Sequence, residues 1–206
     1  MTTKAGVTRL AVPQIKEASL VLARAFYDDP FTIYVTPDDA KRRRVLPWYY
    51  SAATRYGHLF GEVYTTADRT EGVAIWLPPD KAIVTTIRLV RVGLLATPLR
   101  LGLAAFRRLI SAMNHLEELH KRAVPPQHWY LVYLGVDPPR QGQGIGSALM
   151  RPILARADAE GLPCYVETAQ PKSVPLYQRH GFEIVVAGDL LKGGPHLWTM
   201  KREPQR

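Results

Sequence analysis

Val136-Asp137-Pro138-Pro139-Arg140-Gln141-Gly142-Gln143-Gly144-Ile145-Gly146-Ser147-Ala148-Leu149 is the stretch that decides how the rest of the chain is interpreted. An apolar run from Trp129 to Val136 leads into it, and a helical pattern of apolar residues begins at Ser147. We therefore predict a strand, a glycine-rich loop and a helix. The three glycines let the backbone approach a ligand closely, and the amides of a first helical turn have no acceptor inside the helix. An anion, and first of all a phosphorylated ligand, is expected at this loop.

Two familiar glycine-rich motifs do not fit this spacing. A Walker loop ends in Gly-Lys-Ser/Thr, but no lysine follows these glycines, and a dinucleotide fingerprint runs G-x-G-x-x-G where this chain has G-x-G-x-G. The pattern that fits is Gln-x-x-Gly-x-Gly from Gln141 to Gly146. It resembles the acetyl-CoA signature of the GCN5-related N-acetyltransferases, the GNAT family. The alternative is a glycine-rich turn that merely joins two elements.

Composition and charge limit the class of protein. The 206 residues are 47% hydrophobic and 22% charged, as expected for one globular domain. The single cysteine, Cys164, excludes an internal disulfide and is expected in a buried strand. The net charge of +9 suits nucleic acid, anionic lipid or a polyanionic small molecule such as CoA. Because the polar start leads into no apolar signal segment, a cytoplasmic location is expected.

The hydrophobic periodicity predicts a mixed α/β fold. Strands are predicted at residues 7–10, 61–66, 72–77, 128–136, 164–168, 182–186 and 196–201. Helices are predicted at 13–27, 37–56, 147–160 and 173–180, with two more between Ala82 and Ala123 that are interrupted at Thr97-Pro98. Asp28 to Phe31 is predicted to be a turn. The order strand, helix, strand around the glycine loop implies a parallel pair of strands.

Two basic segments need an interpretation. Lys41-Arg42-Arg43-Arg44 is expected to be a solvated helix face, because no stacking motif or nucleic-acid-binding module accompanies it. Between Ala82 and Ala123, arginines interrupt every apolar run well short of a membrane span. This segment is either a cover over a substrate cleft or an interfacial membrane helix, and the cover is favoured. Neither nucleic acid nor a membrane is therefore expected as a partner.

The resemblance to the GNAT family covers about residues 128 to 202. Its second signature, Leu-Tyr-x-x-x-Gly-Phe, lies in Val174-Pro175-Leu176-Tyr177-Gln178-Arg179-His180-Gly181-Phe182. Together with Val166-Glu167-Thr168-Ala169, this looks like the branch that includes puromycin N-acetyltransferase. Gln170 stands where the pattern usually has Asn, and Gln141 stands where Arg is frequent; both keep hydrogen-bonding capacity.

The resemblance implies a fold. It is a GNAT-like α/β (α+β) single domain over residues 1–206, with a mixed central sheet that splays between two parallel strands and is flanked by helices. Residues 82–127 would be a helical insertion covering the acceptor side.

The resemblance also implies acetyl-CoA as co-substrate and no metal. Amides matching Gln143 to Ser147 would bind the diphosphate, and a strand edge matching Leu134 to Val136 would hold the pantetheine arm. The implied cofactor-binding residues are Leu134, Gly135, Val136, Gln141, Gly142, Gln143, Gly144, Ile145, Gly146, Ser147, Ser173 and Tyr177.

Tyr177 matches the family tyrosine that can protonate the leaving thiolate, although it could also be a packed aromatic with a surface hydroxyl. The amine must lose a proton, and the oxyanion needs a donor such as a backbone N–H near Leu134. Candidate bases are His128 and Tyr130 on one strand and Glu167 and Glu62 on others. A water relay without a single base remains open.

The expected function is transfer of an acetyl group from acetyl-CoA to a primary amine of a small molecule. The alternatives are an acetyltransferase acting on protein or peptide amines, and a CoA-binding regulatory module without catalysis, against which Tyr177 argues. A closed pocket lined by Phe31, Tyr34, Trp48 and Trp76 would favour a hydrophobic amine, whereas an acid-rich groove would favour a cationic one. A homodimer is considered as well.

Overall fold

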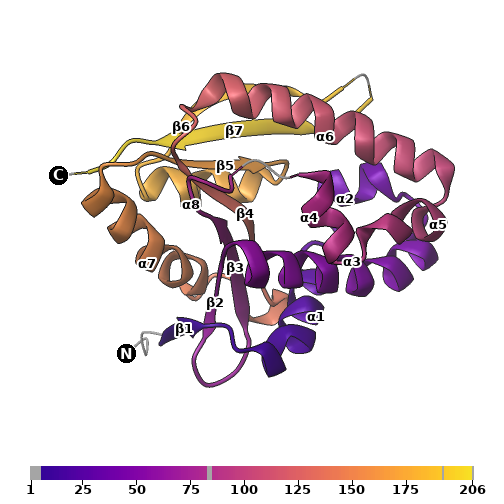
Figure 1. The fold of residues 1–206 in the computed structure, drawn as a ribbon, viewed down its shortest axis with the longest axis horizontal. Helices are drawn as coiled ribbons and strands as arrows, with labels where there is room; N and C mark the ends of the chain where they lie inside the picture. The colour runs from indigo at the N-terminus through magenta and orange to yellow at the C-terminus, as the bar shows by residue number, and fades with distance from the viewer. Residues whose placement is uncertain (1–5, 83–84, 192, 206) are drawn as a thin grey trace.

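The computed structural model describes residues 6–82, 85–191 and 193–205, and its centre is a seven-stranded sheet in the order β1-β2-β3-β4-β5-β7-β6 (Figure 1). The strands are β1 (Val7–Arg9), β2 (Glu62–Thr66), β3 (Gly72–Leu77), β4 (Trp129–Val136), β5 (Cys164–Thr168), β6 (Glu183–Asp189) and β7 (His196–Arg202). The α-helices are α1 (Ile15–Ala25), α2 (Pro30–Val35), α3 (Asp39–Phe60), α4 (Thr86–Arg91), α5 (Thr97–Leu101), α6 (Leu103–Ala123), α7 (Ile145–Glu160) and α8 (Val174–Arg179). The predicted mixed α/β class is confirmed.

The sheet contains one parallel pair among its described strands. β4 and β5 run parallel, and every other neighbouring pair is antiparallel. The parallel pair forms because α7 returns the chain across one face of the sheet between the two strands, as parallel neighbours require. Cys164, at the start of β5, is buried as predicted.

The parallel pairing is short and ends at a β-bulge. In the described register, Trp129 to Leu131 face Cys164 to Val166, and the pairing goes no further. On the other side of β4, Ile75 pairs with Tyr133 and Trp76 pairs with Leu131, so that Val132 is an extra residue. Such a bulge bends its strand. β4 and β5 therefore splay apart from this point, as predicted.

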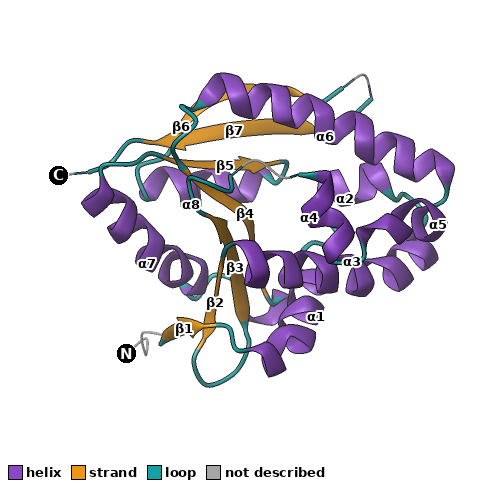
Figure 2. Cartoon of the chain, in the orientation of Figure 1, coloured by secondary structure: helices purple, strands orange, loops and turns teal. Residues whose placement is uncertain are grey.

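Helices cover both faces of the sheet (Figure 2). α7 and α8 lie on one face, where Leu149 and Ile153 are buried in a cluster with Leu131 of β4. α1 and α3 lie on the opposite face, where Leu22 and Tyr50 are buried in a cluster with residues of β2 and β3. Side chains of a strand point alternately to the two faces, so each face receives half of each strand's side chains.

The bulge changes which β4 residues share a face. Leu131 and Leu134, three apart, both join the cluster under α7, whereas Tyr133 joins the cluster under α1 and α3. Tyr130 also lies on the α3 side, packed with Leu77 and Val132. Strict alternation would have placed Tyr130 and Tyr133 on opposite faces.

The prediction of a simple turn from Asp28 to Phe31 is wrong, because a short helix begins inside it. The Asp29 carboxylate accepts hydrogen bonds from the amides of Phe31 and Thr32, at 3.0 and 3.3 Å. A side chain of this type caps a helix, and a proline such as Pro30 is favoured at the first helical position. The result is α2, which lies between α1 and α3 in the chain.

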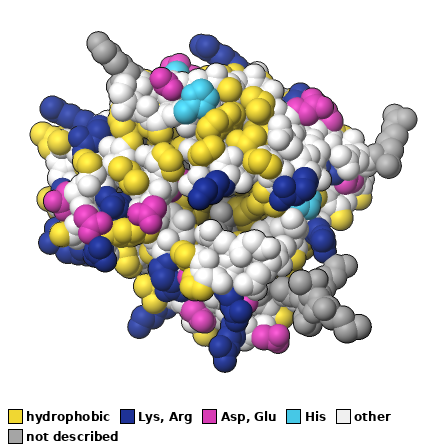
Figure 3. All heavy atoms as spheres, turned by 180° about the vertical axis from the view of Figure 1, so that it is seen from behind, with side chains coloured by type: hydrophobic (Ala, Val, Ile, Leu, Met, Phe, Trp, Pro, Cys, Tyr) yellow, Lys and Arg dark blue, Asp and Glu magenta, His cyan; other side chains and the backbone are white. Residues whose placement is uncertain are grey.

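The segment between Ala82 and Ala123 contains three α-helices among its described residues, not two. It breaks at Gly93 and Gly102, whose φ angles are +85° and +73°, while Thr97-Pro98 begins α5 instead of interrupting a helix. α6 packs over β7 and against α2. The α5–α6 end of the molecule exposes basic side chains beside hydrophobic ones, at the left of Figure 3. Within the described residues, every helix is too short or too polar to span a bilayer.

Candidate active site

The glycine-rich loop presents free backbone amides at the start of α7. Gly142 and Gly144 have φ angles of +76° and +81°, and Gly144 is the residue that caps the helix. The amide of Ala148 donates to the Gly144 carbonyl at 3.0 Å, so the amides from Ile145 to Ser147 precede the first intrahelical bond. A Cβ on Gly142 or Gly144 would meet nothing within 4 Å, so backbone conformation is what requires glycine here. The exposed loop and the positive end of the helix dipole suit a diphosphate.

Ion pairs brace this loop on both sides. Arg24 of α1 donates two hydrogen bonds to the Asp137 carboxylate, at 2.8 and 2.7 Å. Arg140 pairs with Glu71 at 2.6 Å, and the Asp137 amide donates to the Glu71 carbonyl at 2.8 Å. The side chain of Gln141 turns back, and its Nε2 donates to the Val136 carbonyl at 3.1 Å. Because these contacts form within the chain itself, the loop has its shape before any ligand binds.

The start of α7 lies against the end of β4 and against α8. A Cβ placed on Gly146 would lie 3.4 Å from Leu176 of α8 and 3.7 Å from Leu134 of β4. Ser173 directly precedes α8, without a side-chain capping hydrogen bond, and Tyr177 follows within that helix. The structure therefore brings the predicted cofactor-binding residues of β4, the loop and α8 to one end of the β4–β5 gap.

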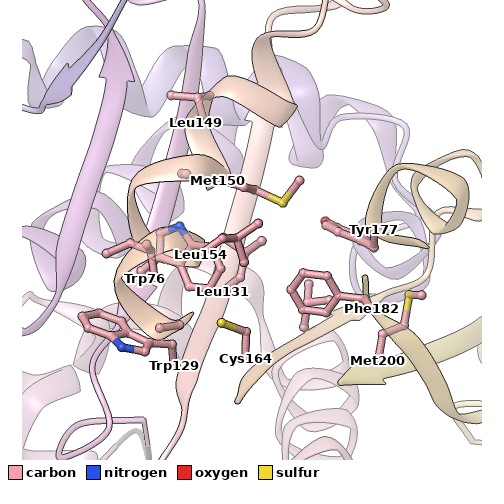
Figure 4. Packing of buried hydrophobic residues seen from close by; sticks show 14 of the residues in the cluster. Trp76, Trp129, Leu131, Leu149, Met150, Leu154, Cys164, Tyr177, Phe182 and Met200 are labelled. Carbon is pink, nitrogen blue, oxygen red and sulfur yellow. The ribbon is translucent and has the colours of Figure 1, made fainter. Parts of the chain in front are cut away.

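Tyr177 is buried among the side chains between α7, α8 and the sheet, as Figure 4 shows. Its ring packs edge-on against Phe182, with 5.8 Å between ring centroids. Burial, together with the negative charge of Asp29, raises the pKa of the Tyr177 hydroxyl above its usual value. Because of this raised pKa the hydroxyl is protonated, and with no hydrogen-bond partner among the described residues it is available as a donor.

Glu167 lies on β5 directly after Val166, the last residue of β5 that pairs with β4. Its two carboxylate oxygens accept hydrogen bonds from the hydroxyls of Tyr165, at 2.9 Å, and Tyr130, at 3.1 Å. Burial raises the pKa of Glu167 to about 7, although both hydrogen bonds act to lower it. A carboxyl group with this pKa is suited to exchange protons at neutral pH.

His128 is buried, and both nitrogens of its ring are occupied. Nδ1 lies 2.6 Å from the Pro125 carbonyl, and Nε2 lies 2.7 Å from Nε2 of His120. Since a carbonyl can only accept, Nδ1 of His128 carries the proton and its Nε2 accepts from His120. Burial lowers the pKa of His128, and it lowers the pKa of His120 to about 3. This arrangement leaves His128 without a free lone pair for an amine.

Glu62 and Trp76 lie apart from the gap. Glu62 pairs with Arg9, and with Arg156 of α7 at 2.8 Å. Burial would raise the pKa of Glu62, but the hydrogen bonds from Arg9 and Tyr64 outweigh it and leave the pKa lowered. Trp76 is fully buried in the cluster under α7, as Figure 4 shows, so a substrate on the other face would not reach it.

Phe31, Tyr34 and Trp48 do lie together. All three are half-buried and pack with α5 and α6 side chains such as Leu101 and Leu109. Phe31 and Tyr34 also contact a second cluster that includes Ala169, just beyond β5. Three of the four predicted acceptor residues therefore lie beneath the helical segment that was predicted to cover the cleft.

Sequence reasoning missed Tyr165 and Asp29. Tyr165 stands two residues before Glu167 on the same strand, so the period of two could have placed both side chains on one face. Asp29 precedes a proline, which is a cap signal that was overlooked. Burial raises the pKa of Asp29, while its bonds from two backbone amides act to lower it.

The sequence is similar to that of known acetyltransferases. The model of the acetyltransferase (GNAT) family matches residues 101–182. An uncharacterized N-acetyltransferase of Schizosaccharomyces pombe is 26% identical over 180 residues, which cover 84% of this chain and 72% of that protein.

Solved structures share the fold over nearly the whole chain. A histone acetyltransferase and related acetyltransferase from Corynebacterium glutamicum is 24% identical, with a TM-score of 0.65 over 99% of this chain and 98% of that one. Arylalkylamine N-acetyltransferase 2 from Aedes aegypti is 13% identical, with a TM-score of 0.69 over 98% of this chain and 100% of that one. In the part of the chain that the family model matches, the sequence is therefore similar to GNAT-family acetyltransferases, and the fold is the one that these enzymes share, as the glycine loop predicted.

Proposed function

We propose that this chain transfers an acetyl group from acetyl-CoA to the primary amine of a small molecule. The observation that carries the proposal is the position of Glu167. Its carboxylate is held by Tyr130 and Tyr165 where β4 and β5 begin to separate, and its pKa is about 7. A proton acceptor next to a gap that ends in an anion-binding loop is the arrangement that amine acylation needs.

The loop and the strand edge would hold the co-substrate. Free amides from Gln143 to Ser147, at the positive end of α7, would bind its diphosphate. On the β5 side, the β4 edge from Leu134 to Val136 lies beyond the last residue that pairs with β5 and would face the pantetheine arm. When bound there, acetyl-CoA supplies an activated acyl group as a thioester.

Two side chains would transfer the protons of the reaction. Glu167 would accept the proton that the amine loses as it attacks, and Tyr177 would donate a proton to the departing thiolate. Near neutral pH a substantial fraction of Glu167 is ionised, because its pKa is about 7, and Tyr177 is protonated, because its pKa is raised. A backbone N–H of β4 near Leu134 would donate to the developing oxyanion.

The residues on the acceptor side favour an amine with an apolar body. Phe31, Tyr34 and Trp48 offer aromatic surface beneath α6, and aromatic side chains bury large apolar area. A fold neighbour named for arylalkylamines is consistent with this choice, as is the sequence resemblance to the puromycin N-acetyltransferase branch. Peptide amines are the competing substrates within the same reaction.

The test is an acetyl-CoA thiol-release assay against a panel of arylalkylamines, puromycin and other amine-bearing antibiotics, polyamines, amino acids and peptides. We expect release above the rate of hydrolysis with at least one apolar primary amine, and loss of that release in Glu167→Gln. A thermal shift with acetyl-CoA is measured in parallel. Binding without release for every amine would instead indicate a CoA-binding regulatory module, and release only with peptides would overturn the small-molecule assignment.

A further inference from the structure

The junction of α5 and α6 leaves large aliphatic side chains in solvent. Leu99 is 89% exposed and Leu103 is 62% exposed, on either side of Gly102, whose φ of +73° turns the chain between the two helices. Single exposed leucines are ordinary, but two large ones that flank a turn between helices, bordered by polar groups, mark an interaction surface. We call Leu99, Gly102 and Leu103 the leucine corner.

Cations surround the leucine corner. Lys41 of α3 places its Nζ 3.1 Å from where a Cβ of Gly102 would lie. The Arg100 guanidinium lies over the Trp48 ring, 5.1 Å from its centroid. Arg107 is exposed one turn after Leu103, on the same face of α6.

The positive charge of this segment is not neutralised locally. Residues 85–116 contain five arginines and no aspartate or glutamate. The described residues include no ion pair for Arg100 or Arg107. Their charges are therefore available to an external anion.

A hollow of about 260 Å³ lies beside the leucine corner, between it and the loop before α3. Lys41 and Arg108 line it, together with Leu101 and Leu103. Asp38 also lines it, and its carboxylate accepts the backbone N–H of Lys41 at 2.6 Å as the cap of α3. The hollow thus combines apolar walls with two cations.

We infer that the leucine corner docks on an anionic phospholipid surface. Leu99 and Leu103 enter the headgroup–acyl boundary, and Lys41, Arg100 and Arg107 contact lipid phosphates. Exposed aliphatic side chains bordered by cations have the two properties that interfacial binding combines, apolar burial and attraction to anionic lipid. The docking is peripheral, because no described helix could cross a bilayer.

The aliphatic tips favour a membrane over nucleic acid. Both attract cations, but protruding leucines offer no stacking surface for a base, whereas they can enter the apolar boundary of a lipid bilayer. Docking at this corner is also compatible with α6 as the cover of the acceptor side. The buried face of α6 packs against α2 and β7, while the exposed Leu103 lies in its first turn and the exposed Leu99 in the preceding helix α5.

Vesicle co-sedimentation tests the inference with the full chain. The probes are vesicles of phosphatidylcholine mixed equally with phosphatidylserine, and vesicles of phosphatidylcholine alone. We expect binding to the first and little to the second, with loss at high salt. The double variant Leu99→Ser/Leu103→Ser should bind roughly tenfold more weakly or worse, because it removes the apolar contact. Arg100→Gln/Arg107→Gln should lose about fivefold for each cation removed.

Matched controls change the same residue types elsewhere. Val12→Ser/Leu59→Ser alters side chains that are 61% and 58% exposed outside the corner, and Arg55→Gln/Arg69→Gln removes two exposed cations outside it. The Val12→Ser/Leu59→Ser control should leave vesicle binding unchanged. The Arg55→Gln/Arg69→Gln control should weaken binding only by the general effect of a lower net charge. Melting curves confirm folding, and Leu99→Ser alone serves if the double variant is unstable.

Three results would overturn the inference. The first is failure of the wild-type chain to sediment with phosphatidylserine vesicles at low salt. The second is unchanged binding by the serine double variant, which would reduce the effect to net charge. The third is binding to single-stranded RNA, but not to vesicles, that depends on Arg100 and Arg107, which would make this corner a nucleic-acid surface.

Discussion

Burial and hydrogen bonding have opposite effects on the pKa of the Glu167 carboxyl group. Burial favours its neutral form, while the hydroxyls of Tyr165 and Tyr130 stabilise its charged form. Its pKa is about 7 as a result, so near neutral pH a substantial fraction is ionised and can accept a proton. The folded-state pKa exceeds the ordinary value of 4.5. Ionisation of Glu167 is therefore unfavourable for folding, and stability is lost as the pH rises from the ordinary value through about 7.

Glu167→Gln should affect activity and stability in opposite directions. We expect kcat/KM for the acceptor to fall by about 10²–10⁴, the range for loss of a general base, and the rise of activity through pH 7 to disappear. Because glutamine carries no charge, the free energy of unfolding above pH 7 should increase. Steady-state kinetics and melting curves across neutral pH measure both effects. A less stable and inactive variant would indicate a structural role instead.

Tyr130→Phe should move the pH profile without abolishing activity. Loss of the 3.1 Å hydrogen bond to the Glu167 carboxylate removes a contact that lowers its pKa, so the acid limb of kcat/KM should shift to higher pH. Tyr133→Phe is the matched control, since the Tyr133 hydroxyl bonds to that of Tyr49 at 2.8 Å and not to Glu167. If both variants shift the limb equally, Tyr130 does not act on Glu167.

The sequence could name candidate general bases among single residues, but it could not rank them. His128 had the ordinary pKa of a base, yet its environment depends on His120 and the Pro125 carbonyl, which only the fold brings together. Glu167 was among the candidates, but the two tyrosines that hold it come from different strands. Burial and hydrogen bonds, which decide a pKa, are tertiary properties.

The element that the sequence described best is α7 with its loop. Its glycines and its apolar periodicity are local signals, and the structure starts the helix at Ile145 and ends it at Glu160, before Gly161. α2 was missed because a six-residue helix has too few turns to show periodicity. The bulge at Val132 was invisible because it is defined by pairing with β3, not by the residue itself.

Gly144→Asp should abolish the stabilisation of the fold by acetyl-CoA. The new carboxylate would stand at the free amides of α7 and repel the diphosphate, and acetyl-CoA binding is what raises the melting temperature. Gly161→Asp is the matched control at the other end of α7. Its φ is +66° and a Cβ there also meets nothing within 4 Å, so it carries a comparable backbone strain.

Both glycine variants should melt earlier than the wild type without ligand. Only Gly144→Asp should also lose the upward shift with millimolar acetyl-CoA. An undiminished shift in Gly144→Asp would remove the loop from co-substrate binding, whereas loss of the shift in both variants would point to general destabilisation.

In the whole molecule, the proposed site is divided between two parts of the chain. Residues 128–182 supply the loop, the β4–β5 gap and Tyr177, and the earlier helices α2 and α3 with α5 and α6 supply aromatic surface on the other side. The single domain over residues 1–206, the homodimer and the cytoplasmic location stay predictions.

Phe31→Ala should raise the KM for the acceptor by about tenfold or more while leaving that for acetyl-CoA nearly unchanged, since it removes one apolar contact of the acceptor. Phe60→Ala removes a comparable half-buried aromatic at the far end of α3 and should leave both KM values unchanged. Equal increases in the two KM values, or loss of folded protein, would assign Phe31 to the core.

Because Val132 is an extra residue of β4, the bend of this strand depends on the number of residues in it. Without this residue, Leu131 and Tyr133 would be neighbours, and both would keep their partners on β3 and their faces of the sheet. Loss of one codon would thus leave the strand regular, but it would remove the bend at which β4 leaves β5 and the contact of Val132 with the Leu77 cluster. The bend beside the β4–β5 gap therefore depends on the number of residues in β4 as well as on their identity.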